Sequence, residues 1–214
     1  MYYFNYNPML TKAWYRNTPN DAYIRVLHAS PNVPAVDIYA NGNLIIENLG
    51  YKQLSKYLSV AAGNYNIEIY PTGQRNNPVL DTDLYIPKGT VFNITVIGEA
   101  PNISLYPIPE PTTKQNFGRP CIRFVNLSPN APNVDVTLSD GREIFTNVGY
   151  KNFTDYACIP TGTYTFQISP TGTNDIVVTV PNVNLMPNNY YTIYAVGLAD
   201  GSPPLQAVVA SEPR

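Results

Sequence analysis

The sequence predicts an all-β protein made of two tandem antiparallel β-sandwich domains, of the immunoglobulin-like or transthyretin-like kind. Three observations lead to this fold class. The 214-residue chain repeats itself once, at an offset of 98 to 99 positions. Each copy consists of short segments of alternating apolar and polar residues, with turn signals at intervals of roughly 8–12 residues, as a β-sandwich requires. Neither copy shows the apolar period of a helix.

The repeat is clearest at Ser30–Asp37 (SPNVPAVD), which returns as Ser128–Asp135 (SPNAPNVD). After one inserted residue the match continues, and Pro71–Gly73 corresponds to Pro170–Gly172. A repeat of this length is a duplicated domain, because solenoid units have periods of roughly 20–50 residues. Each copy, with roughly 90–100 residues, is long enough to bury a core without help from a metal or a disulfide.

We expect four segments along the chain: an aromatic and asparagine-rich arm at 1–21, a first sandwich at 22–108, a proline-rich linker at 109–120 and a second sandwich at 121–214. Residues 107–120 (PIPEPTTKQNFGRP), which contain this linker, have no apolar pattern. Its prolines remove backbone donors and stiffen the connection, so the linker is expected to be semi-rigid.

About seven strands are expected in the first copy, and the second copy repeats them. Asn41-Gly42 is the strongest two-residue hairpin signal, and Asp140-Gly141 takes its place in the second copy as another former of type I′ turns. Residues 56–60 lead into the turn before the fourth strand. The strands expected in the first copy are 23–28, 36–39, 44–46, 65–70, 79–86, 91–98 and 103–106.

Charge and composition argue against two classes of function. The net charge is −2, and lysine and arginine never stand side by side, so the chain lacks the basic stripe that nucleic-acid binding needs. No stretch approaches the ~20 apolar residues of a membrane span. Only 13% of the residues are charged, about half the usual share, a composition common in extracellular and surface β-proteins.

Residues 1–8 (MYYFNYNP) lack the basic start and the apolar core of a secretory signal. Removal of a leader, export by another route and a cytoplasmic location are therefore all open. The leaderless start, rich in tyrosine, asparagine and proline, is similar to the ends of spore-coat proteins of Gram-positive bacteria. We expect an extracellular location, or one on a cell or spore surface.

The two cysteines, Cys121 and Cys158, both lie in the second copy, where the first copy has Tyr23 and Ser59. Because the first copy folds without cysteines, a disulfide is not a requirement of the fold. We expect two buried free thiols, with a bridge between them as the alternative. Without a Cys-x-x-Cys motif or a nearby histidine, the spacing indicates neither a zinc site nor a redox site.

Two motifs of the first copy, His28–Tyr39 (HASPNVPAVDIY) and Tyr57–Tyr65 (YLSVAAGNY), resemble the DUF4397 family. In the second copy, Asn126–Val136 and Tyr156–Tyr164 follow the same pattern, so the resemblance covers both copies. It implies bacterial or archaeal surface-associated β-sandwich modules, often in tandem and often secreted, and it implies no activity. The second copy has Asn126 where the family typically has the histidine that His28 matches.

Asp37 and Asp135 are the most suggestive acids, each seven residues beyond the serine of a Ser-Pro-Asn motif. As calcium ligands they would act with carbonyl oxygens of Asn32 or Asn130. Calcium takes six to eight oxygens, however, and one carboxylate per copy is too few. We expect instead that each carboxylate accepts backbone N–H bonds from the proline-interrupted loop beside it.

His28 is the only histidine of the chain. A hydrolase would need it within hydrogen-bond reach of a nucleophile such as Ser30, with Asp37 beside it. Because Asn126 fills the same place in the other copy, we expect a strand-end histidine bonded to a loop carbonyl. No nucleophile-elbow, zinc-protease, Walker or dinucleotide motif occurs. We therefore predict no enzyme activity, no catalytic, cofactor-binding or metal-binding residues, and no cofactor.

The chain has 18 tyrosines. Tyr57 and Tyr156 recur at matched positions, as do Tyr65 and Tyr164, so these four are expected to be core or corner residues with bonded hydroxyls. The aromatic residues of the arm have three alternative roles: covering their own domain, contacting a neighbouring subunit, or stacking on a ligand such as a sugar. They are Tyr2, Tyr3, Phe4, Tyr6, Trp14 and Tyr15.

The function that we expect is that of a non-enzymatic structural or interaction protein of a bacterial cell or spore surface, with the sandwiches as spacer or assembly modules. The first alternative is a module that binds carbohydrate or cell wall. The remote alternative is a hydrolase that uses His28. The expected partners are a second copy of the chain, a surface protein or a polysaccharide.

Overall fold

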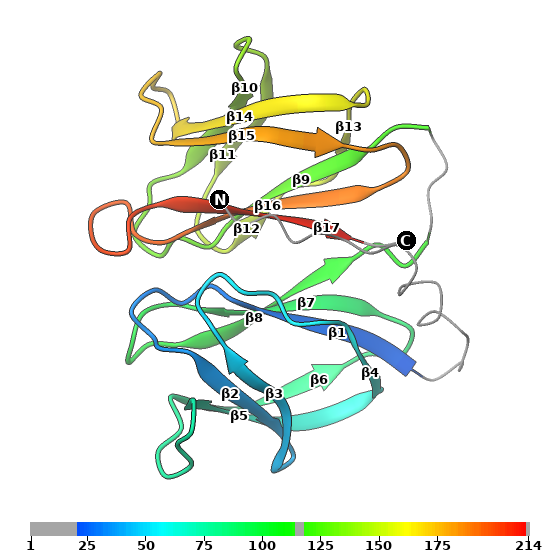
Figure 1. The fold of residues 1–214 in the computed structure, drawn as a ribbon, viewed down its shortest axis with the longest axis vertical. Helices are drawn as coiled ribbons and strands as arrows, with labels where there is room; N and C mark the ends of the chain where they lie inside the picture. The colour runs from blue at the N-terminus through cyan, green and yellow to red at the C-terminus, as the bar shows by residue number, and fades with distance from the viewer. Residues whose placement is uncertain (1–20, 114–117, 213–214) are drawn as a thin grey trace. The chain divides into compact units, whose positions relative to one another are not determined.

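The computed structural model describes residues 21–113 and 118–212, which form strands, turns and loops and contain no helix. They divide into two compact units, one of residues 21–112 and the other of residues 113 and 118–212. Each unit has two sheets packed face to face (Figure 1), so the predicted all-β, tandem sandwich fold is confirmed. Apart from Asp21, the predicted arm lies outside the described residues.

The first unit contains eight strands in two four-stranded sheets, ordered β4-β1-β7-β8 and β3-β2-β5-β6. Neighbouring strands are antiparallel, except that β1 and β7 are parallel. The strands are β1 (Asp21–His28), β2 (Val36–Ala40), β3 (Asn43–Leu49), β4 (Leu58–Ala61), β5 (Gly63–Pro71), β6 (Leu80–Ile86), β7 (Val91–Ile97) and β8 (Ser104–Glu110).

The second unit repeats this arrangement in sheets ordered β12-β9-β16-β17 and β11-β10-β14-β15, with β13 also paired to β9. Again one pair, β9 with β16, is parallel. The strands are β9 (Cys121–Asn126), β10 (Val134–Leu138), β11 (Glu143–Val148), β12 (Asn152–Phe153), β13 (Ala157–Cys158), β14 (Gly162–Pro170), β15 (Val178–Leu185), β16 (Tyr190–Val196) and β17 (Gln206–Glu212).

Each unit has its own apolar core between its two sheets. In the first unit Ile24 and Val26 of one sheet belong to the same buried cluster as Ile67 and Ile69 of the other. Because strand residues alternate between faces, Arg25 points away from this core, yet it is also buried. The central strands β1 and β7 are therefore buried on both faces, unlike the half-exposed strands that the alternating sequence predicted.

Two differences from the predicted strands have local causes. Residues 58–61, expected only as the lead into a turn, form β4 and pair with β1. β8 continues to Glu110, two residues into the predicted linker at 109–120. Proline is tolerated there because β8 is an edge strand, where a missing N–H costs no bond within the sheet.

The first hairpin of each unit explains the inserted residue of the repeat. Asn41 and Gly42 both have positive φ values, 48° and 77°, so the predicted type I′ turn is confirmed. In the second unit Gly141 has φ 86° but Asp140 does not share a positive φ, and Leu138 N–H donates to the carbonyl of Arg142. The predicted type I′ turn is wrong here, because the extra residue converts a two-residue loop into a three-residue loop.

Candidate functional site

His28 ends β1, and its side chain is fully buried. Its Nε2 lies 3.0 Å from the carbonyl oxygen of Pro34, so this nitrogen carries the proton and donates it. The bond holds the loop between β1 and β2 and confirms the expected strand-end histidine bonded to a loop carbonyl. Burial lowers the pKa of His28, although the backbone groups of Pro34 and Val33 act in the opposite direction.

The ring of Tyr51 meets His28 edge-on, with 6.1 Å between the ring centroids. Nδ1 of His28 and the hydroxyl of Tyr51 are both buried, and neither forms a hydrogen bond with the described residues. Burial raises the pKa of Tyr51 to about 12. In the second unit Asn126 leaves no such unsatisfied atom, since its amide donates to Val148 and accepts from the N–H of Ser128.

The serine of each Ser-Pro-Asn motif is buried and holds a loop in place through its hydroxyl. Ser30 donates its hydroxyl proton to the carbonyl of Gly98 at 2.5 Å, and Ser128 donates to Gly197 at 2.7 Å. Each bond ties the loop after the first strand of the unit to the turn after β7 or β16. Since Ser30 and His28 donate to different carbonyls, the structure does not arrange them as a nucleophile and its base.

Asp37 joins two segments that are far apart in the sequence. Its Oδ1 accepts the N–H of Asn48 at 2.8 Å and the hydroxyl of Thr72 at 3.2 Å, and its Oδ2 accepts the N–H of Gly73 at 2.9 Å. The predicted role as an acceptor of backbone N–H bonds is confirmed. The donors, however, come from the end of β3 and the turn after β5 rather than from the proline-interrupted loop.

Asp135 repeats this arrangement in the second unit, with bonds from Asn147, Thr171 and Gly172 at 2.7, 2.8 and 3.1 Å. Burial alone would raise the pKa of Asp37 and Asp135, but the hydrogen bonds outweigh it, and the pKa of both carboxyl groups is lowered. Both oxygens of each carboxylate are therefore engaged within the protein. Among the described residues, no group of acids, cysteines and histidine is arranged to hold a metal ion.

A buried ion pair, not anticipated from the sequence, occurs in both units. Arg25 lies 2.8 Å from Glu110 in the first unit, and Arg123 lies 3.2 Å from Glu212 in the second. All four side chains are at most 5% exposed. The pairs join the first strand of each unit to its last strand across the intervening β7 or β16. The matched arginines, together with a Glu-Pro at the end of each copy, were the available sequence signal.

The matched tyrosines complete these pairs. Tyr57 donates its hydroxyl to Glu110, and Tyr156 donates to Glu212. Each guanidinium lies over the ring of its tyrosine, at 4.9 Å in the first unit and 4.8 Å in the second. In addition, the hydroxyls of Tyr65 and Tyr164 donate to carbonyls four residues earlier in the chain, Ala61 and Pro160. The expectation of core or corner tyrosines with bonded hydroxyls is confirmed.

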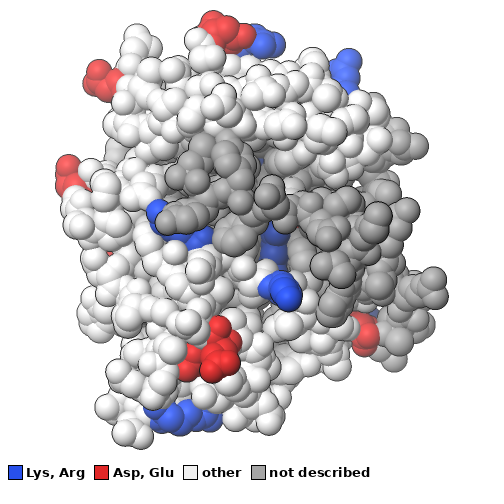
Figure 2. Space-filling view, in the orientation of Figure 1, with Lys and Arg blue, Asp and Glu red and all other residues white. Residues whose placement is uncertain are grey.

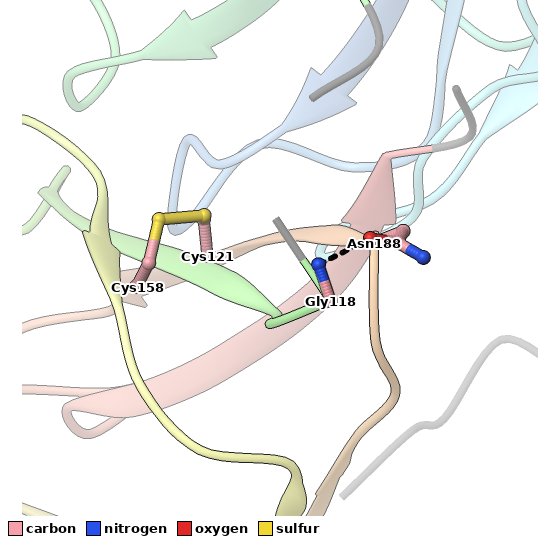
Figure 3. The surroundings of a disulfide bond; sticks show 4 residues. All are labelled: Gly118, Cys121, Cys158 and Asn188. Atoms are coloured by element: carbon pink, nitrogen blue, oxygen red, sulfur yellow. Dashed lines mark hydrogen bonds between the residues drawn. A yellow bond between two sulfur atoms is a disulfide. The ribbon is translucent and has the colours of Figure 1, made fainter. Parts of the chain in front are cut away.

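Cys121 and Cys158 form a disulfide, so the expectation of two free thiols is wrong (Figure 3). The two residues face each other in the register of β9 and β13. The first unit has Tyr23 and Ser59 opposite each other at the matching place in β1 and β4. The lack of cysteines in the first unit means only that the fold does not require a bridge. A bridge forms in the second unit because the pairing of β13 with β9 makes the two cysteines cross-strand neighbours.

The first unit also has a polar cluster that the second lacks. Tyr39 and Tyr70 meet edge-on at 5.6 Å on the outer face of β2 and β5, and the guanidinium of Arg75 lies 3.5 Å from the centre of the Tyr39 ring. Glu68 accepts the hydroxyl of Tyr70 and contacts Arg75. The second unit has Thr137, Ser169, Asn174 and Gln167 at the corresponding positions.

This contrast separates two kinds of residue. Groups present in both units serve the common fold, whereas the Tyr39–Tyr70–Arg75 cluster is dispensable for a sandwich of this type. On the same outer face, but at the other end of β5 from Tyr70, Tyr85 of β6 pairs with Asn64 and is 63% exposed, and Asn184 takes its place in the second unit. The outer face of β2, β5 and β6 is therefore the candidate binding surface of the chain.

Charged residues are sparse on the surface. On the face drawn in Figure 2, the lysine, arginine and acidic side chains form small separate groups among uncharged residues, with no basic stripe. In the described part of the chain, no helix is long and apolar enough to cross a membrane.

The fold and these contacts define a tandem β-sandwich protein whose two units share a buried ion pair and the same serine and aspartate hydrogen bonds. The chain belongs to the DUF4397 family, a domain of unknown function, whose profile matches residues 22–137 and 137–214. The resemblance seen in the sequence motifs is thus confirmed over both copies. A comparison with curated proteins finds no match.

Three solved structures are similar to the chain at low identity. The Bacillus anthracis TIE protein is 13% identical, with a TM-score of 0.27, and the match covers 82% of this chain and 33% of that one. The chain thus spans a third of the length of that structure. A family 26 carbohydrate-binding module from Eubacterium rectale, in complex with maltoheptaose, is 12% identical, with a TM-score of 0.26 and coverages of 91% and 97%.

A streptococcal virulence factor that binds α-glucan is 13% identical, with a TM-score of 0.25 and coverages of 83% and 92%. At this level of similarity the three structures assign no ligand to this chain.

Proposed function

We propose that the chain is a non-enzymatic structural and interaction protein of a bacterial cell or spore surface, in which the two sandwiches act as spacer or assembly modules. The observation that carries this proposal is the use of the reactive groups. His28, Ser30 and Asp37 each hold a loop in place through their own hydrogen bonds. Ser128 and Asp135 do the same in the second unit.

The Cys121–Cys158 disulfide supports the surface location. Disulfides persist in oxidising surroundings and are rare in the cytosol, where thiols are kept reduced. A spacer outside the cell also benefits from two stable sandwiches whose polar surface is largely uncharged, because such a surface responds little to salt.

Light scattering of the full chain against a version starting at Asp21 tests the assembly role. We expect the full chain to associate as its concentration rises and the shortened chain to stay monomeric. Monomeric behaviour of both versions at every concentration would remove the assembly role.

The second candidate function is binding of a cell-wall or other polysaccharide by the outer face of β2, β5 and β6. The specific observation is the cluster of Tyr39, Tyr70 and Arg75 on the same sheet face as the exposed ring of Tyr85. Aromatic rings stack on the apolar faces of sugars. Of the three rings, that of Tyr85 is the one that is largely exposed, since Tyr70 is 5% exposed and Arg75 covers the ring of Tyr39. Arg75 and the acids nearby are able to bond hydroxyl groups.

The second unit supplies the matched control for this candidate. Tyr39→Thr, Tyr70→Ser and Tyr85→Asn introduce the residues that the second sandwich itself carries, so the fold is expected to persist. We expect retention of the parent chain on insoluble polysaccharide or peptidoglycan, and loss of that retention in the triple variant. Retention that is equal for both chains, or absent for both, rules out this surface as a polysaccharide site.

A further inference from the structure

One edge of the first unit is suited to receive an additional strand. β6 is the last strand of its sheet, and seven consecutive residue pairs join it to β5 without a register shift. Its residues alternate between half-buried and exposed as far as Ile86, which is buried. Leu80 and Leu84 pack against the core but are only partly covered, so a further strand would bury more apolar surface.

The equivalent edge of the second unit is blocked. β15 contains Pro181, whose nitrogen has no proton to donate, and Asn182 has a φ of 58°. The pairing of β15 with β14 is also shifted between Tyr164 and Phe166. Proline and a bulge are the usual devices that prevent a sheet edge from pairing with another chain. β6 has neither.

The other long edges are also protected or covered. β8 contains Pro107 and Pro109, and the pairings of β3 and β11 are interrupted by register shifts. β17 has no proline, but none of its residues is exposed. Among the described strands of five or more residues, β6 is thus the edge that combines a regular backbone with exposed side chains.

The charge on β6 selects the kind of strand that pairs with it. Asp81 and Asp83 are both exposed and lie on the same face of the strand. Antiparallel pairing of β6 with its own copy about Thr82 would set each Asp81 opposite an Asp83, which is unfavourable. A suitable partner instead carries cations on one face of its strand.

The arm of this chain has that pattern. Lys12, Trp14 and Arg16 alternate with Ala13 and Tyr15. These residues lie outside the described part of the structure, so the pattern is taken from the sequence alone. In the antiparallel register that sets Arg16 opposite Asp81, Lys12 lies opposite Tyr85 and diagonal to Asp83, within reach of its carboxylate.

We propose that the outer edge of β6 accepts residues 10–16 of a second copy of the chain as an added antiparallel strand. This inference rests on the proposed assembly function and specifies its contact. Repetition of a head-to-tail contact of this kind makes a chain of subunits rather than a closed dimer.

Strand direction favours the second copy over the chain's own arm. Asp21 pairs with Ala61, and Gly63 pairs with Ile86, so β1 starts at the end of the sandwich where β6 finishes. An arm leading directly into its own β1 would therefore run parallel to its own β6. The arm of another copy is free to run antiparallel, which is the slightly more stable pairing.

Two complementary full-length variants test the contact. The first, Asp81→Lys with Asp83→Lys, reverses the charge of the edge and keeps the arm. The second, Lys12→Glu with Arg16→Glu, reverses the arm and keeps the edge. Each variant alone is expected to associate about tenfold more weakly than the parent, because two favourable pairs are replaced by like charges. Sedimentation velocity measures the association.

Mixing the two variants gives the sharpest result. The mixture is expected to regain the association of the parent, with the two variants alternating along the line, because the native arm pairs with the native edge and the reversed arm pairs with the reversed edge. A chain carrying all four reversals is expected to regain the association of the parent. Trp14, the only tryptophan, reports the contact independently through a shift of its emission on mixing.

Asp155→Lys with Asp200→Lys is the control for the edge variant, because both acids are exposed in the second unit and the change in net charge is the same as in that variant. Association of the parent that the edge and arm variants leave unchanged, or that the control weakens equally, overturns the β6 contact and leaves the assembly function standing. A parent chain that is monomeric at every concentration overturns both.

Discussion

Removal of the disulfide should destabilise the second unit alone. Cys121 and Cys158 are 37 positions apart in the sequence. In the chain-entropy account, closing a loop of that length removes about 13 cal/mol/K from the unfolded state, or about 4 kcal/mol at 25 °C. For a domain of about 100 residues this corresponds to a fall in Tm of about 20 °C.

Hydrogen exchange with and without a reducing agent measures the effect, because it follows the amides of each unit separately. Protection of β9 and β16 should fall by about 4 kcal/mol on reduction, while protection of β1 and β7 stays constant. Cys121→Ala with Cys158→Ala should reproduce the reduced protein. A loss below about 1 kcal/mol, or an equal loss in the first unit, would refute the assignment of the stabilisation to this loop.

The first unit offers the reciprocal experiment. Tyr23 and Ser59 occupy the same cross-strand pair, and their separation of 59 − 23 = 36 positions is almost that of the natural bridge. Tyr23→Cys with Ser59→Cys should therefore stabilise the first unit on oxidation, by less than about 4 kcal/mol because engineered bridges deliver less than the entropy predicts. Oxidation that leaves the first unit unchanged would show that register alone does not suffice.

Three further predictions concern the buried ion pair, the two aspartates and the histidine. Arg25→Met should cost the first unit about 3–5 kcal/mol in urea unfolding by leaving Glu110 buried without its cation, and Arg25→Met with Glu110→Leu should recover most of the loss. Asp37→Asn and Asp135→Asn should each cost about 1–3 kcal/mol. The folded pKa of both groups is lowered, so their stabilising effect is complete above pH ~4 and is lost as the pH falls through the folded pKa. The free energy of unfolding of each variant should therefore fall less steeply in acid than that of the parent. Because burial lowers the pKa of His28, the unfolded chain takes up its proton first, and the first unit should lose stability as the pH falls below ~6.5. His28→Asn, which introduces the residue of the second unit, should remove this loss of stability. A pH profile that is the same in the variant and the parent would contradict its assignment to His28.

The fold class was predictable because both copies carry the same local signals. Alternation in Tyr65–Tyr70 and the Asn41-Gly42 turn depend only on neighbouring residues. The parallel pairing of β1 with β7 and the burial of both faces of these strands were not predictable in this way. They depend on which strands, distant in the sequence, become neighbours.

The same reason explains which site residues were found. Asp37 and Tyr65 stand out because they recur at matched positions, and both were assigned correct kinds of contact. Arg25 and Glu110 are 85 positions apart, so their pairing follows only from the placement of β1 and β8 on either side of β7. The disulfide was missed for the same reason, since its two positions become opposite only when β13 pairs with β9.

Duplication also explains how one half of this protein is able to specialise. The second unit retains the buried ion pair and the serine and aspartate hydrogen bonds of the first, so these contacts are common to both sandwiches. The first unit differs from it at the outer face of β2 and β5 and along β6, where substitutions leave those contacts untouched. Among the described strands of five or more residues, the blocked edge on β15 and the open edge on β6 leave one regular, exposed place for an arriving strand to pair. One acceptor edge per chain limits growth to a single line of subunits, whereas two equivalent edges would allow branching.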